Sequence, residues 1–412
     1  MKICVFTLGC KVNASESESL MRGLKEAGHT VTETLERADL YIVNTCAVTA
    51  EAEKKSRQTA ARIRALNPCA EIIYTGCACQ KDFSAFSDKE NVRLVTGAFD
   101  KGKILSMLEE RGVKIAPERG DFEEMPAPET VRARQYIKVQ DGCDNFCSYC
   151  IIPYLRGRSR SRAKESVKRE IDGAKCAEVV LNGINLSAYR DGETDLAGLM
   201  HYLADTEKRV RLGSLEVRVV TDELLTALSE MRSFAPHFHL SLQSGSDAVL
   251  AAMNRRYTAA EYLEKVSLIR KYFPFAGVTT DVIVGFPAET EENFAQTLSL
   301  VKTARFSDVH CFPYSPRSGT KAYSMKDLPS EVKKERLARL VALKNRCKAA
   351  FEEENFGRTE MFVPEETENG YCAGYTGNYL RAYVQGELPC RAVSVIVKEK
   401  FRGGVLAEIK GE

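Results

Sequence analysis

Regular alternation of strand and helix signals constrains the fold of this chain more than any other feature of its sequence. In residues 1–115, apolar stretches typical of buried strands are separated by stretches with helical periodicity. The expected strands cover residues 3–8, 40–44, 72–75 and 92–95, with helices at 17–27 and 51–66. Because strand–helix–strand order favours parallel pairing, we expect an α/β domain with a parallel sheet.

The alternation is interrupted once and then resumes. Residues 116–130 contain three prolines and five acidic residues without apolar periodicity, which predicts a linker. Residues 131–355 contain six further strand–helix units. Their order fits either a partial (β/α)6 barrel or an open doubly wound sheet. The expected strands lie at 136–139, 178–181, 209–212, 238–242, 278–284 and 309–312, and a long charged helix covers 331–355.

The last segment, residues 356–412, has a different pattern. Apolar and β-branched runs at 393–397 and 405–409 are separated by glycine-rich turns. Short strands joined by such turns predict a small antiparallel β-barrel.

Composition limits the classes of protein that the chain can belong to. The 412 residues include 59 Lys and Arg against 57 Asp and Glu, a formal net charge of +2. Net charge alone therefore says nothing about a nucleic-acid partner. No stretch approaches the roughly 18 apolar residues of a membrane-spanning helix. The first residues predict a strand rather than a signal peptide. We therefore expect a cytoplasmic protein without a membrane partner, whose 14 cysteines are reduced.

Three cysteines lie on one short loop after the strand at 136–139. Cys143, Cys147 and Cys150 have C-x3-C-x2-C spacing. Three thiolates match a 4Fe–4S cluster whose fourth iron is open to a substrate atom. The alternative is structural zinc, which normally needs a fourth Cys or His, and no histidine is near in sequence.

A second set of cysteines ends three successive strands of the first domain. Cys10, Cys46 and Cys77 each follow a predicted strand. Because the carboxyl ends of parallel strands share one sheet edge, we expect these thiols to converge and to hold a second cluster with an open iron. The alternative is that they are coincidental turn residues. Cys79 lies two residues after Cys77 and is a competing ligand.

Polar residues and glycines follow the strands of the second array. Ligands bind such arrays at the strand ends, which makes these residues candidates for contacting a nucleoside cofactor. Ordinary turn chemistry explains each of them equally well. The candidate cofactor-binding residues are Asn182, Gln243, Ser244 and Gly285.

The cysteine loop, with Tyr149 before its last cysteine, resembles the radical S-adenosylmethionine (SAM) superfamily. Together with the motifs at 7–17, 44–49, 142–153, 156–162 and 241–247, it resembles the methylthiotransferase family over nearly the whole chain. That resemblance implies an N-terminal cluster domain, a radical-SAM domain and a C-terminal TRAM barrel. It also implies two 4Fe–4S clusters and SAM as cofactors. The sequence departs from the usual family pattern at Cys79, Val217, Ala288 and Ser318.

One motif points to a branch of this family. Residues 10–13, Cys-Lys-Val-Asn, resemble the branch that acts on N6-threonylcarbamoyladenosine at position 37 of tRNA. The isopentenyladenosine branch typically has Gly-Cys-Gln-Met-Asn. The resemblance implies addition of a methylthio group to C2 of the adenine. One SAM would methylate sulfur on the N-terminal cluster, and a second would supply the radical that activates C2. A reductant such as flavodoxin or ferredoxin is an implied partner.

Local charge offers a route to RNA contact. Residues 155–170 contain seven basic and two acidic side chains, dominated by Arg156, Arg158, Arg160 and Arg162. Arginine suits bidentate phosphate contact, so we interpret this run as a guide for tRNA, with a solvated loop as the alternative. Residues 358–412 carry a net charge of −1. The C-terminal barrel offers only tyrosines for base stacking, and these are equally consistent with packing: Tyr375, Tyr379 and Tyr383.

Two rival functions remain open. One keeps the chemistry but changes the target to another adenosine or a protein side chain. The other is a non-catalytic iron–sulfur or zinc protein that binds RNA.

Overall fold

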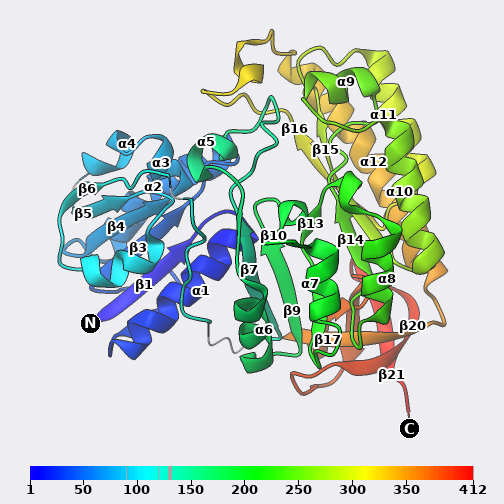
Figure 1. Cartoon of the computed structure of the whole chain (residues 1–412), viewed down its shortest axis with the longest axis horizontal. Helices are drawn as coiled ribbons and strands as arrows, with labels where there is room; N and C mark the ends of the chain where they lie inside the picture. The colour runs from blue at the N-terminus through cyan, green and yellow to red at the C-terminus, as the bar shows by residue number, and fades with distance from the viewer. Residues whose placement is uncertain (90, 119, 129–131, 412) are drawn as a thin grey trace.

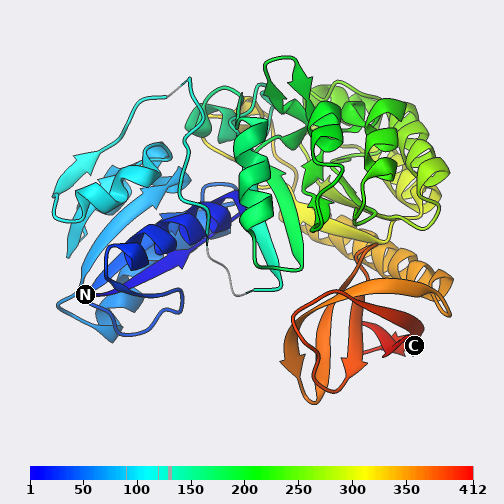
Figure 2. The same cartoon turned by 60° about the horizontal axis from the view of Figure 1, so that its bottom comes forward.

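The structure, a computed structural model, describes residues 1–89, 91–118, 120–128 and 132–411. Three units follow one another along the chain (Figures 1 and 2). A sheet flanked by helices comes first, a larger strand–helix array lies in the centre, and a small barrel follows at the C-terminal end.

The first unit is a six-stranded parallel sheet of order β2-β1-β3-β4-β5-β6, so the predicted parallel α/β domain is confirmed. Strands β1, β3 and β4 correspond to the strands expected at 3–8, 40–44 and 72–75. They are parallel neighbours in that order and therefore end at the same edge. The two outermost strands were not predicted, because each has only three residues and no buried side chain. The strands are β1 Lys2–Thr7, β2 Thr30–Thr32, β3 Leu40–Thr45, β4 Glu71–Gly76, β5 Val92–Thr96 and β6 Gly112–Lys114.

Helices pack on both faces of this sheet, over two separate apolar clusters. Helix α1 (Lys11–Glu26) starts directly after β1, and α2 (Ala50–Leu66) follows β3 with Thr49 as N-cap. The short helix α3 (Cys77–Lys81) starts at the end of β4. Three cysteine-bearing turns therefore lie at the ends of adjacent strands.

The central array follows the chain order of its strands, which identifies it as a partial barrel rather than a doubly wound sheet. Strand β12 pairs with β9, and after Gly213 its continuation β13 pairs with β14, so the two hydrogen-bonded sheets form one curved wall. The wall strands are β7 Arg134–Asp141, β9 Glu178–Gly183, β12 Arg209–Leu212, β13 Ser214–Leu215, β14 His237–Leu240, β15 Gly277–Val284 and β16 Asp308–Pro313.

Helices cover the outside of this wall and enclose the largest apolar cluster of the chain. The long helix α12 then leads to the C-terminal barrel (Figure 2). The helices are α6 Lys164–Gly173, α7 Leu196–Tyr202, α8 Asp222–Glu230, α9 Asp247–Ala252, α10 Ala259–Tyr272, α11 Glu291–Ala304 and α12 Ser330–Glu354. Short α9 was not predicted, because six residues are too few for a clear period.

The C-terminal unit is a closed five-stranded barrel of order β17-β18-β19-β21-β20, which confirms the predicted small β-barrel. All its pairs are antiparallel except β19 with β21. The strands are β17 Thr359–Glu368, β18 Tyr371–Thr376, β19 Arg381–Gln385, β20 Val393–Phe401 and β21 Gly404–Ile409.

Buried arginines fasten this barrel to the central wall. Arg209 donates to the carbonyl oxygen of Met361 over 2.6 Å, and Arg211 donates to that of Gly377 over 2.9 Å. Both guanidinium groups also bind the fully buried carboxylate of Glu178, over 2.5 Å and 2.8 Å. One carboxylate at the start of β9 therefore holds the two groups that dock the barrel.

The segment expected to be a linker contains no helix or strand at its described residues 116–118 and 120–128, while 119, 129 and 130 lie outside the described residues. It contacts the rest of the chain: Glu118 accepts a hydrogen bond from the backbone nitrogen of Arg158, and Glu124 pairs with Arg162. Within the described part of the chain, no helix is long and apolar enough to cross a membrane.

Candidate metal and cofactor site

The three strand-end cysteines of the first unit converge on one cavity of about 870 Å³. Cys10 lies between β1 and α1, Cys46 follows β3, and Cys77 is the first residue of α3. Gly9 allows this approach, because its φ is +105° and a Cβ there would lie 2.6 Å from the Sγ of Cys46. The expected convergence of these thiols is therefore what the sheet topology produces.

The cysteine loop between β7 and α5 (Ile152–Arg156) faces the same cavity. Cys143 and Cys150 line the cavity, and Cys147 lines a separate pocket of about 440 Å³. The loop is held by hydrogen bonds from the Cys143 nitrogen to the Gly157 oxygen and from the Cys150 nitrogen to the Cys147 oxygen, both 3.0 Å. Five of these six cysteines, from two sets more than sixty residues apart, thus line one cavity, while Cys147 lines the smaller pocket.

Burial keeps three of these sulfur atoms protonated in the absence of a metal. It raises the pKa of Cys46 and of Cys143 to about 11 and that of Cys150 to about 12. A bound metal would displace those protons, since the thiolate is the ligand. Grouped buried thiols that are open to a cavity therefore suit a metal centre.

The spread of the sulfur atoms distinguishes between kinds of centre. Four sulfurs on one zinc ion lie roughly 3.8 Å apart, as Zn–S bonds of about 2.3 Å require. Among the described residues, the single group of three ligand atoms within 4.8 Å of one another is His239, Asp281 and His310. In neither cysteine set do all three sulfur atoms lie within 4.8 Å of one another, as ligands of a single ion would. A 4Fe–4S cluster is larger than one ion and fits more widely spaced sulfur atoms.

Cys79 lies away from the cavity that the other cysteines share. Its side chain is fully buried, with Sγ 3.5 Å from the Thr45 hydroxyl and 3.7 Å from the Thr75 carbonyl oxygen. Burial raises its pKa to about 12. About half a turn of α3 thus separates Cys77, which lines the cavity, from Cys79, which packs behind it.

The four candidate cofactor-binding residues have different surroundings. Asn182 lines the large cavity, is 3% exposed, and neither its amide nitrogen nor its amide oxygen has a hydrogen-bond partner. Ser244 is near the Thr297 hydroxyl (3.3 Å) behind the wall, and the Gly285 nitrogen donates to Glu289. Gln243 has φ +66° and bridges to Val282 of β15. An unsatisfied buried amide costs free energy, so Asn182 is the one best placed to meet a ligand.

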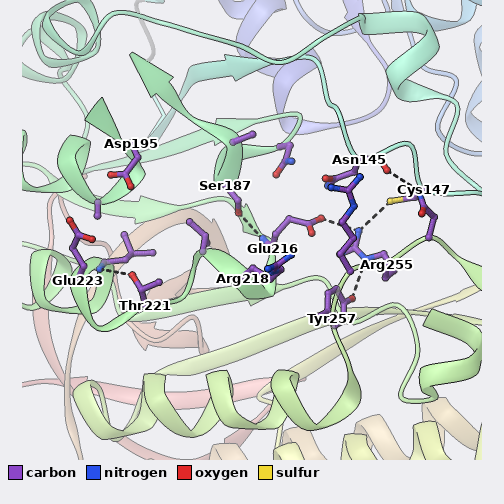
Figure 3. A pocket seen from close by; sticks show the side chains of 17 residues that line it. Asn145, Cys147, Ser187, Asp195, Glu216, Arg218, Thr221, Glu223, Arg255 and Tyr257 are labelled. Carbon is purple, nitrogen blue, oxygen red and sulfur yellow. Dashed lines mark hydrogen bonds and ion pairs between the residues drawn. The ribbon is translucent and has the colours of Figure 1, made fainter. Parts of the chain in front are cut away.

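The smaller pocket beside Cys147 contains a chain of polar contacts (Figure 3). Arg255 Nη1 donates to the Sγ of Cys147 over 3.4 Å and pairs with the carboxylate of Glu216 over 2.9 Å. Its Nε donates to the Tyr257 hydroxyl, whose pKa burial raises to about 12 despite the opposing arginine charge. These groups place positive charge beside one cysteine of the loop.

The interpretation of residues 156–162 as an exposed phosphate guide is wrong for three of the four arginines. Arg156 is 0% exposed, Arg160 8% and Arg162 7%, and all three form ion pairs inside the protein. Only Arg158 is exposed, and it pairs with Asp144. Carboxylates from other parts of the chain bind these three guanidinium groups, and the local charge of the run gives no information on those partners.

The tyrosines of the barrel also have mixed surroundings. Tyr383 is buried, whereas Tyr375 and Tyr379 stack on each other with ring centres 4.5 Å apart and line the large cavity. Tyr379 also stacks on His237 of the wall at 4.2 Å. The barrel therefore closes one end of the cavity with aromatic rings.

Lys11, the first residue of α1, lines the same cavity beside Cys10. Burial lowers the pKa of its ammonium group, and the charges of Arg134 and Arg211 act in the same direction, while Tyr379 and Asp281 oppose them. Lys11, Glu216 and Arg255 were not selected as site residues from sequence. Lys11 belongs to the Cys-Lys-Val-Asn motif, which could have identified it. For Glu216 and Arg255, no local sequence pattern pointed to the site.

Comparisons with known proteins agree with this arrangement. The model of the radical SAM superfamily matches residues 137–301, and that of the uncharacterized protein family UPF0004 matches residues 2–97. The central unit with its cysteine loop is thus a radical-SAM domain. Solved structures share the fold: the radical SAM methyltransferase TsrM from Kitasatospora setae (TM-score 0.59, 15% identity) covers 78% of this chain, with 77% of that chain matched.

Full-length relatives define the family more narrowly. "Threonylcarbamoyladenosine tRNA methylthiotransferase MtaB" of Bacillus subtilis is 38% identical, covering 93% of this chain and 90% of that protein. The Thermotoga maritima protein of the same name is 37% identical, over 97% of this chain and 95% of that protein. The chain belongs to the methylthiotransferase family of radical-SAM enzymes. It is therefore an enzyme, a transferase, and its C-terminal barrel fits a TRAM domain.

Proposed function

We propose that this enzyme adds a methylthio group to C2 of N6-threonylcarbamoyladenosine at position 37 of tRNA, using two SAM molecules and two 4Fe–4S clusters. The observation that supports this most is that five of the six proposed cysteine ligands, drawn from both sets, line one cavity. A single radical-SAM loop would serve many reactions, whereas a second cluster site across the same space supplies a position for the sulfur to be transferred.

The two sets have distinct roles in this proposal. Cys143, Cys147 and Cys150 would hold the cluster beside SAM, and a second cluster would be held by Cys10, Cys46 and Cys77. When bound, these groups supply the electron that cleaves SAM and the sulfur that is transferred. The chain's own contribution is to bring both sets together at one cavity, which residues of the first unit, the central wall and the barrel line.

The SAM-binding residues are a further part of the proposal. Asn182 would hydrogen-bond SAM from the cavity side with its unsatisfied amide. Gln243, Ser244 and Gly285 would act by shaping the turns after their strands. Glu216 and Arg255, next to Cys147, add polar groups on the other side of the loop. The reductant would be a small electron-transfer protein such as flavodoxin or ferredoxin, and the enzyme would work in the cytoplasm.

The relatives' names support both a tRNA target and a choice between two adenosines. Relatives named "tRNA-2-methylthio-N(6)-dimethylallyladenosine synthase" are also similar, with the Endomicrobium trichonymphae protein 32% identical over 99% of this chain and 100% of that protein. The Cys-Lys-Val-Asn motif at 10–13 favours the threonylcarbamoyl substrate over the isopentenyl one.

Nucleoside mass spectrometry of tRNA tests this proposal. A strain lacking the gene should lose 2-methylthio-N6-threonylcarbamoyladenosine and keep its unmethylthiolated precursor. Complementation with the wild type or with Cys347→Ala, a thiol on α12 outside the cavity, should restore the product. Complementation with Cys143→Ala should not. Loss of the isopentenyl product instead would reassign the substrate, and an unchanged set of nucleosides would refute a role in tRNA.

A further inference from the structure

The ammonium group of Lys11 stands in the large cavity without a counter-ion. Among the described residues, no carboxylate lies within 4.0 Å of its nitrogen and no acceptor is hydrogen-bonded to it. The other cations that line this cavity are engaged: Arg381 pairs with Glu366, and Lys348 donates to the Gly403 carbonyl oxygen. Because Lys11 lines this cavity, is exposed there and has no described counter-ion, its ammonium group is available to an anionic ligand.

The acids and arginines around Lys11 are already paired among themselves. Asp281 is the acid whose charge acts on Lys11. Its Oδ2 atom lies 3.1 Å from Nε2 of His239. Glu178 is taken by Arg209 and Arg211. Glu178 is thus neutralised by arginines, whereas the charge of Asp281 is offset only when His239 is protonated, and neither carboxylate is paired with Lys11.

The position of Lys11 places it close to where C2 of the substrate adenine would react. It follows Cys10 directly and so lies beside the proposed sulfur-donating centre. In adenine, C2 and the N6 substituent flank the same ring nitrogen. A base that brings C2 to the sulfur therefore carries its N6 substituent into the same part of the cavity.

The N6 substituents of the two tRNA substrates differ in charge. A threonylcarbamoyl group ends in a carboxylate, whereas an isopentenyl group is a hydrocarbon. A lysine complements only the charged substituent.

We propose that Lys11 binds the carboxylate of the threonylcarbamoyl group and is the residue that selects this substrate. This inference rests on the proposed function and names the contact through which it is achieved. Removing such a charge-assisted hydrogen bond predicts a loss of about ten- to a hundredfold in affinity.

The test compares three anticodon stem-loops that differ only at position 37. They carry N6-threonylcarbamoyladenosine, its methyl ester, in which the charge is removed, and unmodified adenosine. Binding to the cluster-loaded enzyme is measured by fluorescence anisotropy at fixed salt. The variants are Lys11→Gln and Lys11→Arg, and Lys25→Gln serves as a control, because Lys25 is exposed in the last turn of the same helix. Iron content and circular dichroism establish that each variant keeps its clusters and fold.

The wild type and Lys25→Gln should bind the acid at least tenfold more tightly than the ester. Lys11→Gln should lose that preference and bind the ester as the wild type does, while Lys11→Arg should retain most of it. An equal loss on all three RNAs, or an intact preference in Lys11→Gln, would overturn the inference while leaving the proposed function in place. If the wild type itself does not methylthiolate the acid-bearing RNA but modifies an isopentenyl one, the proposed function fails, and this inference with it.

Discussion

The guanidinium group of Arg156 donates a hydrogen bond from its Nε to the Sγ of Cys77 across 3.3 Å. Arg156 belongs to α5 of the radical-SAM domain and Cys77 to α3 of the first unit. The same guanidinium binds the buried carboxylates of Glu16 and Asp141 over 2.7 Å and 3.2 Å. One fully buried cation thus connects both halves of the cavity and orients a cysteine proposed to hold a cluster.

Replacing Arg156 with Met should destabilise the protein by about 3–5 kcal/mol, because it leaves buried carboxylates without a main partner. Arg158→Met is the matched control: its side chain is 69% exposed, and its ion pair with Asp144 should contribute less than about 1 kcal/mol. Urea unfolding followed by circular dichroism measures both. Equal midpoints for the two variants would mean that Lys101, Lys138 and Arg160 compensate fully for the lost charge.

Cys77 and Cys79 are separated by one residue and should behave oppositely on metal reconstitution. With both clusters loaded anaerobically, the wild type should contain about eight irons per chain, since each cluster holds four. Cys77→Ala should lose up to half of this iron. Cys79→Ala should retain all of it, because its sulfur packs behind the cavity against Thr45. Iron loss in Cys79→Ala alone would exchange the two residues as ligands, and zinc without iron in the wild type would refute both clusters.

The sequence was sufficient to predict those parts of the site that follow from topology. Cys10, Cys46 and Cys77 were predicted to converge because parallel strands share an edge, and they do line one cavity. The strand order of the central array could not be decided from alternation, since both candidate folds have the same local periodicity. It became clear from the pairing of β12 with β9 and of β13 with β14.

Side-chain environments were predicted less well, for a physical reason. The run from Arg156 to Arg162 has a high local charge, but whether each guanidinium faces water or a carboxylate depends on distant residues such as Glu16 and Glu124. Pairing between residues 38 and 140 positions apart leaves no local pattern. The same holds for Arg255 and Cys147, which meet only because α9 is followed by a turn toward the cysteine loop.

Arg255 should set the reduction potential of the cluster proposed at Cys143, Cys147 and Cys150. It donates a hydrogen bond to the Cys147 sulfur and brings a positive charge, both of which favour the reduced and more negative cluster. Arg255→Met should therefore lower the reduction potential of the cluster. A given reductant would then reduce a smaller fraction of the cluster, and SAM cleavage would slow. A redox titration monitored by electron paramagnetic resonance measures the shift. Arg256→Met, which lines the same pocket, is the control, and an unchanged potential in Arg255→Met would argue against the contact.

Glu178 should make the docking of the barrel sensitive to acid. Burial alone would raise its pKa, but Arg211 and Arg209 outweigh burial and lower it from 4.5 to about 2. A carboxyl with a depressed folded-state pKa stabilises the fold above its unfolded pKa. This shift corresponds to about 3 kcal/mol at pH 7, lost progressively as pH falls from about 5 toward 2.

Glu178→Gln should therefore be less stable than the wild type at pH 7 by about 3 kcal/mol, with a shallower loss of stability between pH 5 and pH 3. Urea unfolding at a series of pH values from 3 to 7 measures both features. Glu207→Gln, in an exposed pair with Arg232, should follow the wild-type profile within about 1 kcal/mol. Parallel profiles for the wild type and Glu178→Gln would show that this carboxylate does not control the acid limb. In that case the backbone hydrogen bonds from Arg209 and Arg211 would be sufficient to hold the barrel.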